Sequence, residues 1–306
     1  MGRGNLELLL VTVIWGINSI AVKDAVDTFL PLQFNVVRLG LAAILLVAVM
    51  ALSGKMEYPE RKDWPLIILS GFLGNTVYQY TFIKGIAMST ATNTSFVLAT
   101  MPATTAVLSH FMGKQKMTRR MSLGVILTMT GVGLVALGGS GSLSFTSETL
   151  KGDLLTLTGT LGWCLSTIFA ADLVKRMTPT AYTAWTMAAG AILMVPLAAG
   201  ELRAADWRAP SLANWGELVF SASFALVFSY ILWNRGVKAS GPASTAIFGN
   251  LTPVWTGLFG WLILREGWMP FKFLGAAIIL AGVSMVRFGG TATSRDAAAR
   301  DAASAN

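Results

Sequence analysis

The chain has little cysteine, histidine and charge, and each shortage excludes a class of protein. Its 306 residues include one Cys and one His, which excludes a disulfide framework, a multi-cysteine metal site and a paired-histidine zinc site. Charged residues make up 12% of the chain and hydrophobic residues 54%. Soluble domains carry about 25% charged residues. An ordinary water-soluble enzyme and a disordered chain are therefore excluded.

Several chemical motifs are also missing. The chain has no Gly-rich phosphate loop of the Walker type, no His-Glu-x-x-His helix and no Gly-x-Ser-x-Gly elbow. The net charge of +8 is spread between apolar runs and the tails rather than gathered in one block, which argues against a nucleic-acid-binding surface. We expect no catalytic residues, no metal, no cofactor, no nucleic-acid partner and no obligate protein partner.

Long apolar runs dominate what is present. A transmembrane helix needs about 20 mostly apolar residues, and ten runs approach or exceed this length, so we expect an all-α membrane protein with ten transmembrane helices. The runs are Leu6 to Val22, Leu32 to Leu52, Trp64 to Ile86, Ala91 to Phe111, Met121 to Leu137, Leu154 to Val174, Tyr182 to Ala199, Trp215 to Trp233, Pro242 to Leu264 and Phe271 to Val286.

The Lys and Arg residues predict the orientation. If both termini are cytoplasmic, fifteen of the 23 Lys and Arg residues fall in inner segments and seven in outer ones. This excess is the positive-inside pattern. We expect a multi-pass protein of the cell membrane, and specifically of a bacterial inner membrane, with both termini in the cytoplasm.

The second half of the chain repeats the first. A shift of 151 positions, or 148 near the start, aligns residues of the same kind through most of both halves. The aligned pairs include Trp15 and Trp163, Pro31 and Pro179, Trp64 and Trp215, Pro102 and Pro253, Gly124 and Gly275, and Gly131 and Gly282. The first span resembles a signal peptide, but its counterpart in the second half argues against that interpretation.

The repeat predicts the domain organisation. We expect a first five-helix repeat over 1–138, a Gly/Ser-rich outer linker over 139–152, a second repeat over 153–290 and a disordered cytoplasmic tail over 291–306. Five spans are an odd number, so the second repeat enters the membrane from the opposite side. Inverted repeats of this kind are typical of secondary transporters that work by alternating access.

The local motifs resemble those of the EamA family in the drug/metabolite transporter superfamily. The resemblance covers about residues 5–288, and Gln115 departs from it where the family has a glutamate. It rests on Trp15-Gly16-Ile17-Asn18-Ser19, on Arg38 before an apolar run, on Pro102 and Pro253, and on Leu264-Arg265-Glu266. It implies export of amino acids and other small metabolites, and one branch, the YddG-like proteins, exports aromatic amino acids.

Polar and aromatic residues at mid-span are the candidate substrate-binding residues. A transporter of this kind binds its substrate near the bilayer midplane where the repeats meet. The candidates are Trp15, Asn18, Asn75, Tyr78, Gln79, Trp163, Tyr230 and Asn250. Aromatic surfaces with neutral hydrogen-bonding groups suit a neutral or zwitterionic solute. The structural alternative is that they tie helices together or lie in interfacial belts.

Three further residues have two interpretations each. Pro102 and Pro253 kink their helices, either as hinges of moving elements or as static bends. Arg38 is a charge inside a span, which either stabilises the helix packing or contacts a substrate carboxylate. A proton-coupled carrier generally places a carboxylate or histidine in its pathway, and no Asp, Glu or His lies at mid-span here. A gradient-driven facilitator is therefore an alternative to a proton antiporter.

The sequence thus predicts a secondary transporter that exports amino acids, aromatic and other neutral ones, by alternating access. The alternatives are an exporter of purines or cationic drugs and, more remotely, an intramembrane enzyme. The small-molecule substrate and the lipid bilayer are the expected partners.

Overall fold

The computed structural model describes residues 3–89, 97–98, 100–137, 146–264, 274–275 and 277–285. Helices account for nearly all of this part of the chain, which contains no strand. The expected tail at 291–306 and the expected linker residues 139–145 lie outside the described residues.

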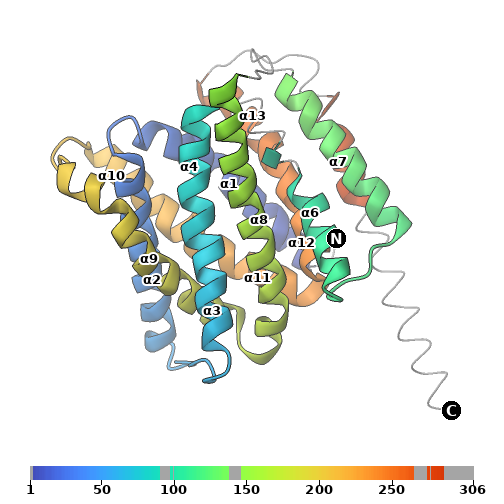
Figure 1. Cartoon of the computed structure of the whole chain (residues 1–306), viewed down its shortest axis with the longest axis horizontal. Helices are drawn as coiled ribbons and strands as arrows, with labels where there is room; N and C mark the ends of the chain where they lie inside the picture. The colour runs from blue at the N-terminus through green and yellow to red at the C-terminus, as the bar shows by residue number, and fades with distance from the viewer. Residues whose placement is uncertain are drawn as a thin grey trace.

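The first half is described by seven helical elements (Figure 1). They are α1 (Arg3–Ala25), α2 (Pro31–Leu52), α3 (Trp64–Gly71), η1 (Phe72–Val77), α4 (Tyr78–Met88), α6 (Met101–Phe111) and α7 (Arg119–Leu137). The second half contains α8 (Ser147–Arg176), α9 (Pro179–Ala204), α10 (Leu212–Phe220), η2 (Ser221–Phe228), α11 (Ser229–Ser240), α12 (Pro242–Ala246), η3 (Ile247–Leu251) and α13 (Thr252–Leu264).

Among the described residues, six helical rods are long and apolar enough to cross a membrane. They are Gly4–Val22, Pro31–Leu52, Trp64–Gly85, Ser147–Arg176, Pro179–Ala204 and Leu212–Ser240. Segments of the other four expected spans are helical at 101–111, 119–137, 242–264 and 277–285. The total of ten spans and the orientation of the termini stay predictions.

α8 begins earlier than the predicted repeat boundary. The sequence places a linker up to residue 152, whereas the helix starts at Ser147. The Thr146 side chain accepts a hydrogen bond from the Thr149 amide, and Glu148 lies in the first turn. Such a cap satisfies an amide that the helix leaves free, and a carboxylate there suits the helix dipole. A local polar signal therefore extends the helix beyond its apolar run.

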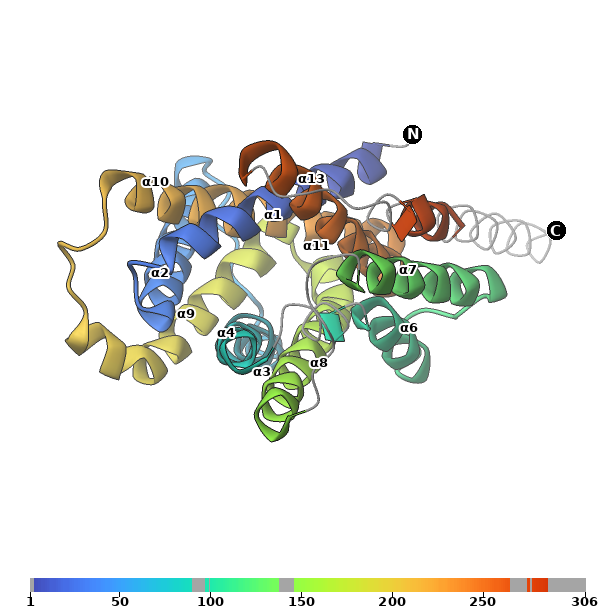
Figure 2. The same ribbon diagram turned by 90° about the horizontal axis from the view of Figure 1, so that it is seen from above.

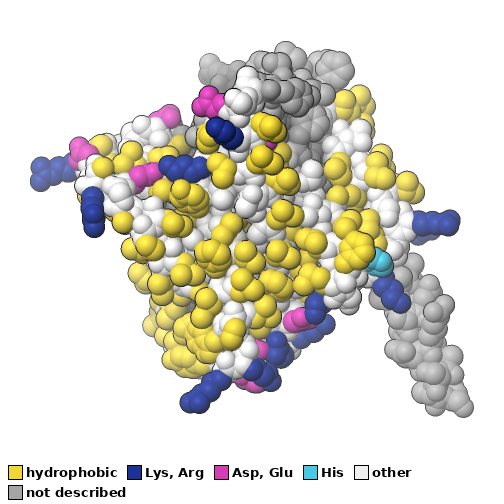
Figure 3. Space-filling model, viewed as in Figure 1, with side chains coloured by type: hydrophobic (Ala, Val, Ile, Leu, Met, Phe, Trp, Pro, Cys, Tyr) yellow, Lys and Arg dark blue, Asp and Glu magenta, His cyan; other side chains and the backbone are white. Residues whose placement is uncertain are grey.

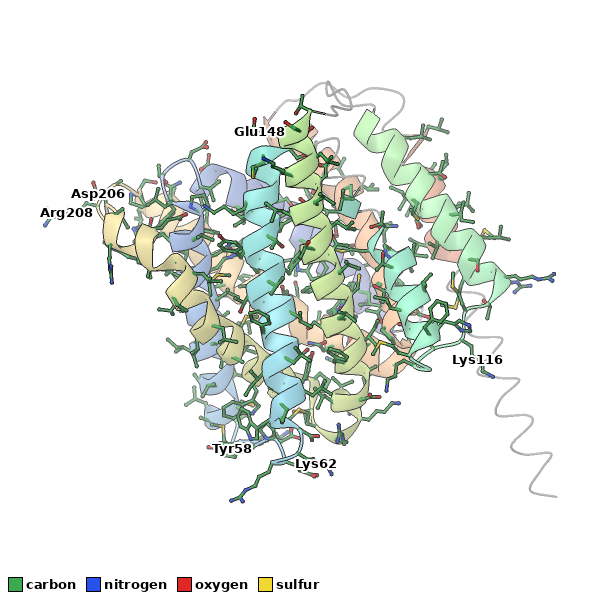
Figure 4. The ribbon with its side chains drawn as sticks, in the orientation of Figure 1. Tyr58, Lys62, Lys116, Glu148, Asp206 and Arg208 are labelled. Carbon is green, nitrogen blue, oxygen red and sulfur yellow. The ribbon has the colours of Figure 1, made fainter. Side chains whose placement is uncertain are left out.

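The outer surface suits a lipid environment. Large side chains point outward from most rods, and Ile44, Ile192 and Leu212 are 67%, 70% and 90% exposed. Figure 3 shows hydrophobic side chains over the middle of the visible face, with most charged ones towards its edges. Figure 4 places Lys62 at the lower edge and Lys116 at the lower right, and Glu148 at the upper edge and Arg208 at the upper left. An apolar band between charged ends is what a bilayer requires.

Two π-helical segments occupy equivalent places in the halves. η1 spans Phe72–Val77 within the rod formed by α3 and α4, and η2 spans Ser221–Phe228 within the rod formed by α10 and α11. A shift of 151 places the first inside the second. π-helical turns inside α-helices are rare and occur frequently at functional sites. They also change which side chains share a face, so Asn75 in η1 does not keep the regular α-helical register with Tyr78 and Gln79 in α4.

The repeat-related helices α2 and α9 cap each other. Glu201, near the end of α9, accepts a hydrogen bond of 2.7 Å from the Leu32 amide at the start of α2. Glu57, after α2, accepts bonds of 3.1 Å from the Thr178 amide and 2.6 Å from its hydroxyl at the start of α9. Each helix thus begins where the other ends. An inverted repeat requires such an antiparallel pair.

The fifth and tenth expected spans make a reciprocal close contact. A Cβ added at Gly131 would lie 2.7 Å from the Gly275 carbonyl oxygen, and one added at Gly282 would lie 2.7 Å from the Gly124 carbonyl oxygen. Both contacts pair the same repeat positions. Small residues allow helices in membranes to pack backbone against backbone.

Both prolines lie in the first turn of a helical segment, and in the helical stretch 242–264 an irregular turn directly precedes Pro253. Pro102 is the second residue of α6, and Pro253 is the second residue of α13 after the 3-10 turn η3. Proline is tolerated in a first turn because the amide there has no intrahelical partner. A hinge role for either stays a prediction.

Candidate functional site

Five aromatic rings from four helices meet inside the protein. They are Trp15 from α1, Tyr78 from α4, Trp163 from α8, and Tyr230 and Trp233 from α11, and we call them the aromatic cluster. Trp163 is in contact with all of the others, with ring centroids 5.2 Å from Tyr78, 5.3 Å from Tyr230, 6.0 Å from Trp15 and 6.1 Å from Trp233. Aromatic rings at these separations attract one another beyond the burial of their surface.

The cluster lies where the two halves meet. Trp15 and Trp163 are repeat-related, and their rings pack edge to face. Figure 2 shows α3 and α4 nearly end-on, with α8 and α9 beside them, so the first half packs directly on the second. The Trp15 indole donates a hydrogen bond of 3.1 Å to the Ala225 carbonyl in η2. This bond joins α1 to one of the π-helical segments.

A small cavity adjoins the cluster. Its volume is about 20 Å³, which is room for about one water molecule. Its lining residues are Asn75, Trp163, Ser166, Thr167, Tyr182, Thr186, Tyr230, Trp233 and Asn234, and none of these is Asp, Glu or His. Aromatic walls with a few neutral polar groups are typical of small-molecule sites. The helices must separate before a metabolite fits.

Hydrogen bonds hold the polar wall in place. The side-chain nitrogen of Asn75 donates a hydrogen bond of 3.1 Å to the Thr186 carbonyl. The buried side-chain oxygen of Asn75 has no partner among the described residues. The Ser70 hydroxyl lies 2.5 Å from the Tyr182 hydroxyl and 2.9 Å from the Ser166 hydroxyl. Asn75 therefore keeps a free acceptor beside the cavity.

Arg38 lies on the side of the cluster that faces α2. Its guanidinium donates a hydrogen bond of 2.9 Å to the Ser221 hydroxyl and one of 2.8 Å to the Gln79 side-chain oxygen. The Arg38 Cζ lies 5.3 Å from the centre of the Phe34 ring. The residue is 5% exposed. Arg38 thus joins α2 to η2 and α4, and the Gln79 side chain also faces the Tyr230 hydroxyl.

The structure brings together most of the residues predicted from the sequence. Four of them belong to the aromatic cluster, Asn75 lines the cavity, and Gln79 contacts Arg38. Asn18 and Asn250 are not among the lining residues; each has one buried side-chain atom without a partner in the described part of the chain. The binding role of all eight residues stays a prediction.

Sequence reasoning missed Trp233, Asn234 and Tyr182. The first two lie three and four residues after Tyr230, and such residues share one face of a helix, so this spacing is the signal that could have found them. The Asn234 side chain donates a hydrogen bond of 3.0 Å to the Thr183 hydroxyl. Tyr182 begins an apolar run and has no comparable signal. In the part of the chain that the structure describes, no group of three or more His, Cys, Asp or Glu could hold a metal.

A family model matches most of the chain. The EamA-like transporter family matches twice, over residues 2–137 and 150–288. A crystal structure of another protein superposes with a TM-score of 0.80 at 14% identity, covering 93% of this chain and 98% of the other. At that identity the likeness shows the fold alone.

Relatives named as transporters occur in several organisms. The uncharacterized transporter YyaM of Bacillus subtilis is 28% identical, covering 91% of each chain. The uncharacterized transporter YoaV of the same organism is 25% identical, covering 92% of this chain and 96% of its own. A WAT1-related protein of Arabidopsis thaliana is 26% identical, covering 85% of this chain and 77% of its own. With the helical architecture and the apolar surface, the double family match shows that this membrane protein belongs to the EamA-like transporter family.

Proposed function

We propose that this protein is a secondary transporter that exports small metabolites, chiefly amino acids with aromatic or other neutral side chains, by alternating access. The observation that carries the proposal is the aromatic cluster beside a neutral polar cavity at the interface between the repeats. Aromatic walls offer stacking surface to an apolar or aromatic side chain, and the polar groups offer hydrogen bonds to a backbone amine and carboxylate.

Contacts at both ends of the rods support alternating access. Near Lys62 and Lys116, Arg176 and Asp63 form an ion pair of 2.6 Å, and Lys114 and Asp172 form one of 2.5 Å. At the other end, Lys84 lies 3.5 Å from Glu201. Contacts between the two halves at both ends are what an occluded state requires. Opening one set of contacts while the other stays closed exposes the cavity to one side at a time.

The cavity chemistry favours transport driven by the solute's own gradient. A proton-coupled carrier generally places an ionisable carboxylate or histidine in its pathway, whereas the described lining residues include none. Arg38 is a charge inside a membrane-spanning helix, and a guanidinium does not release its proton in proteins.

Purines and cationic drugs are the competing substrates, because both stack on aromatic rings. The buried guanidinium of Arg38 beside Gln79 and Tyr230 repels an organic cation, so it favours neutral and zwitterionic solutes over cationic drugs.

Counterflow in liposomes that contain only the purified protein tests this proposal. The vesicles are loaded with an unlabelled solute, and the entry of the same labelled solute is followed without an ion gradient. The panel is tryptophan, phenylalanine, threonine, methionine, glutamate, adenine and a lipophilic cation. We expect exchange of the neutral amino acids. Exchange of adenine or the cation without any amino acid would refute the proposed substrate class.

A further inference from the structure

The guanidinium of Arg38 is a buried positive charge with only neutral partners. Arg38 is the only charged residue of α2, which is long enough to cross a membrane. Its two hydrogen-bond acceptors are a hydroxyl and an amide oxygen, and its Nε has no partner in the described part of the chain. No described carboxylate lies within ion-pair distance of it. Buried charges are normally paired, since an unpaired one is costly in a medium of low polarity.

The position of this charge relates it to the aromatic cluster. Tyr78 and Tyr230 lie close enough to Arg38 to interact with it electrostatically, and Gln79 lies between Arg38 and the Tyr230 hydroxyl. Tyr230 in turn lines the cavity. A solute whose apolar part contacts the rings can therefore direct an anionic group past Tyr230 towards the guanidinium.

The two acceptors of Arg38 lie beside the π-helical segments. Ser221 is the first residue of η2, and Gln79 is the second residue after η1. Guanidinium presents five N–H donors in a planar fork that matches a carboxylate, and two of its nitrogens bind these neutral acceptors. A small shift of either segment frees donors for a ligand.

The second repeat has no equivalent charge. A shift of 148 places Thr186 opposite Arg38, and its hydroxyl donates to the Tyr182 carbonyl at 2.8 Å. The two halves therefore form a site with one cationic side, and a solute with one anionic group binds in one orientation.

We propose that Arg38 binds the carboxylate of the transported solute, so that the substrates are carboxylates with an apolar or aromatic body. This inference rests on the proposed function and narrows it, because it makes the carboxylate the recognised group. The interaction of Arg38 with the carboxylate replaces its neutral hydrogen bonds and compensates the buried charge.

The test compares two inhibitors of labelled phenylalanine exchange in liposomes. 3-Phenylpropionate keeps the carboxylate and lacks the amine, whereas phenylalaninamide keeps the amine and lacks the carboxylate. We expect the wild type to be inhibited at least about tenfold more strongly by 3-phenylpropionate, as the loss of one charge-assisted contact implies. In Arg38→Gln the ratio falls to within about twofold. Arg208→Gln, a matched change at the exposed upper end (Figure 4), keeps the wild-type ratio.

The inhibitor ratio is measured within one sample, so the amount of folded protein cancels. The melting temperature of Arg38→Gln adds a second readout. If Arg38 only tied helices together, Arg38→Gln would melt well below the wild type; a recognition role leaves the melting temperature unchanged or higher, because a buried unpaired charge is removed. A wild-type ratio retained in Arg38→Gln, or equal inhibition of the wild type by both compounds, would overturn the inference while phenylalanine transport stands. If the wild type exchanges no amino acid, the proposed function fails, and the inference fails with it.

Discussion

The reciprocal glycine contact gives the sharpest test of the repeat. Replacing Gly131 by Ala puts a Cβ 2.7 Å from both the Gly275 carbonyl oxygen and the Ile279 side chain. Replacing Gly282 puts one 2.7 Å from both the Gly124 carbonyl oxygen and the Thr128 side chain. Ordinary van der Waals contact begins at 3.4 Å. Because one of the two atoms at 2.7 Å is backbone in each case, the helices must move apart by several tenths of an ångström.

Two opposing effects determine the size of the change. Overpacking of this kind costs about 1–3 kcal/mol, whereas alanine is favoured over glycine in a helix by about 1 kcal/mol. The difference between the two effects lowers the free energy of unfolding by up to about 2 kcal/mol, and we expect the same fall in Gly131→Ala and Gly282→Ala because their surroundings match.

Thermal unfolding of the purified protein in detergent measures the effect. Gly40→Ala and Gly216→Ala are the matched controls, because a Cβ added at either glycine has no atom within 4 Å. These variants should melt at or above the wild-type temperature, and the two test variants clearly below it. The reasoning is wrong if Gly131→Ala melts like Gly40→Ala, or if only one of the two test variants is destabilised.

Three further predictions concern the site and the helix caps. Trp163→Ala removes the ring that contacts the rest of the aromatic cluster and should slow phenylalanine counterflow at least about tenfold. Trp207 is 44% exposed, and Trp207→Ala should change counterflow less than about twofold. Equal losses in the two variants would contradict a binding role for Trp163. Glu201→Ala and Glu57→Ala each remove a helix cap and should each lower stability by about 1 kcal/mol in denaturation experiments; an unchanged Glu201→Ala would contradict the capping role. Counterflow should vary less than about twofold between roughly pH 5.5 and 8, since no described lining residue ionises there; a bell-shaped pH profile would indicate a coupled proton.

The sequence predicted much of the candidate site because the relevant signals are local. Trp15, Tyr78, Trp163 and Tyr230 stood out as aromatic residues inside apolar runs, and the structure brings their rings together. Helix spacing after Tyr230 could have added Trp233. The sequence does not show that a 3-10 turn precedes Pro253, so this irregular backbone became visible only in the structure.

The membrane class, the repeat and the family could be read from the sequence alone. Hydropathy, charge placement and matched residues 151 positions apart are properties of short segments, and they persist whatever the helices contact. Only the tertiary structure decided which residues meet. The reciprocal caps of α2 and α9 and the neutral partners of Arg38 depend on contacts between distant segments. These contacts arise when helices pack, and packing selects among faces that the sequence presents equally well.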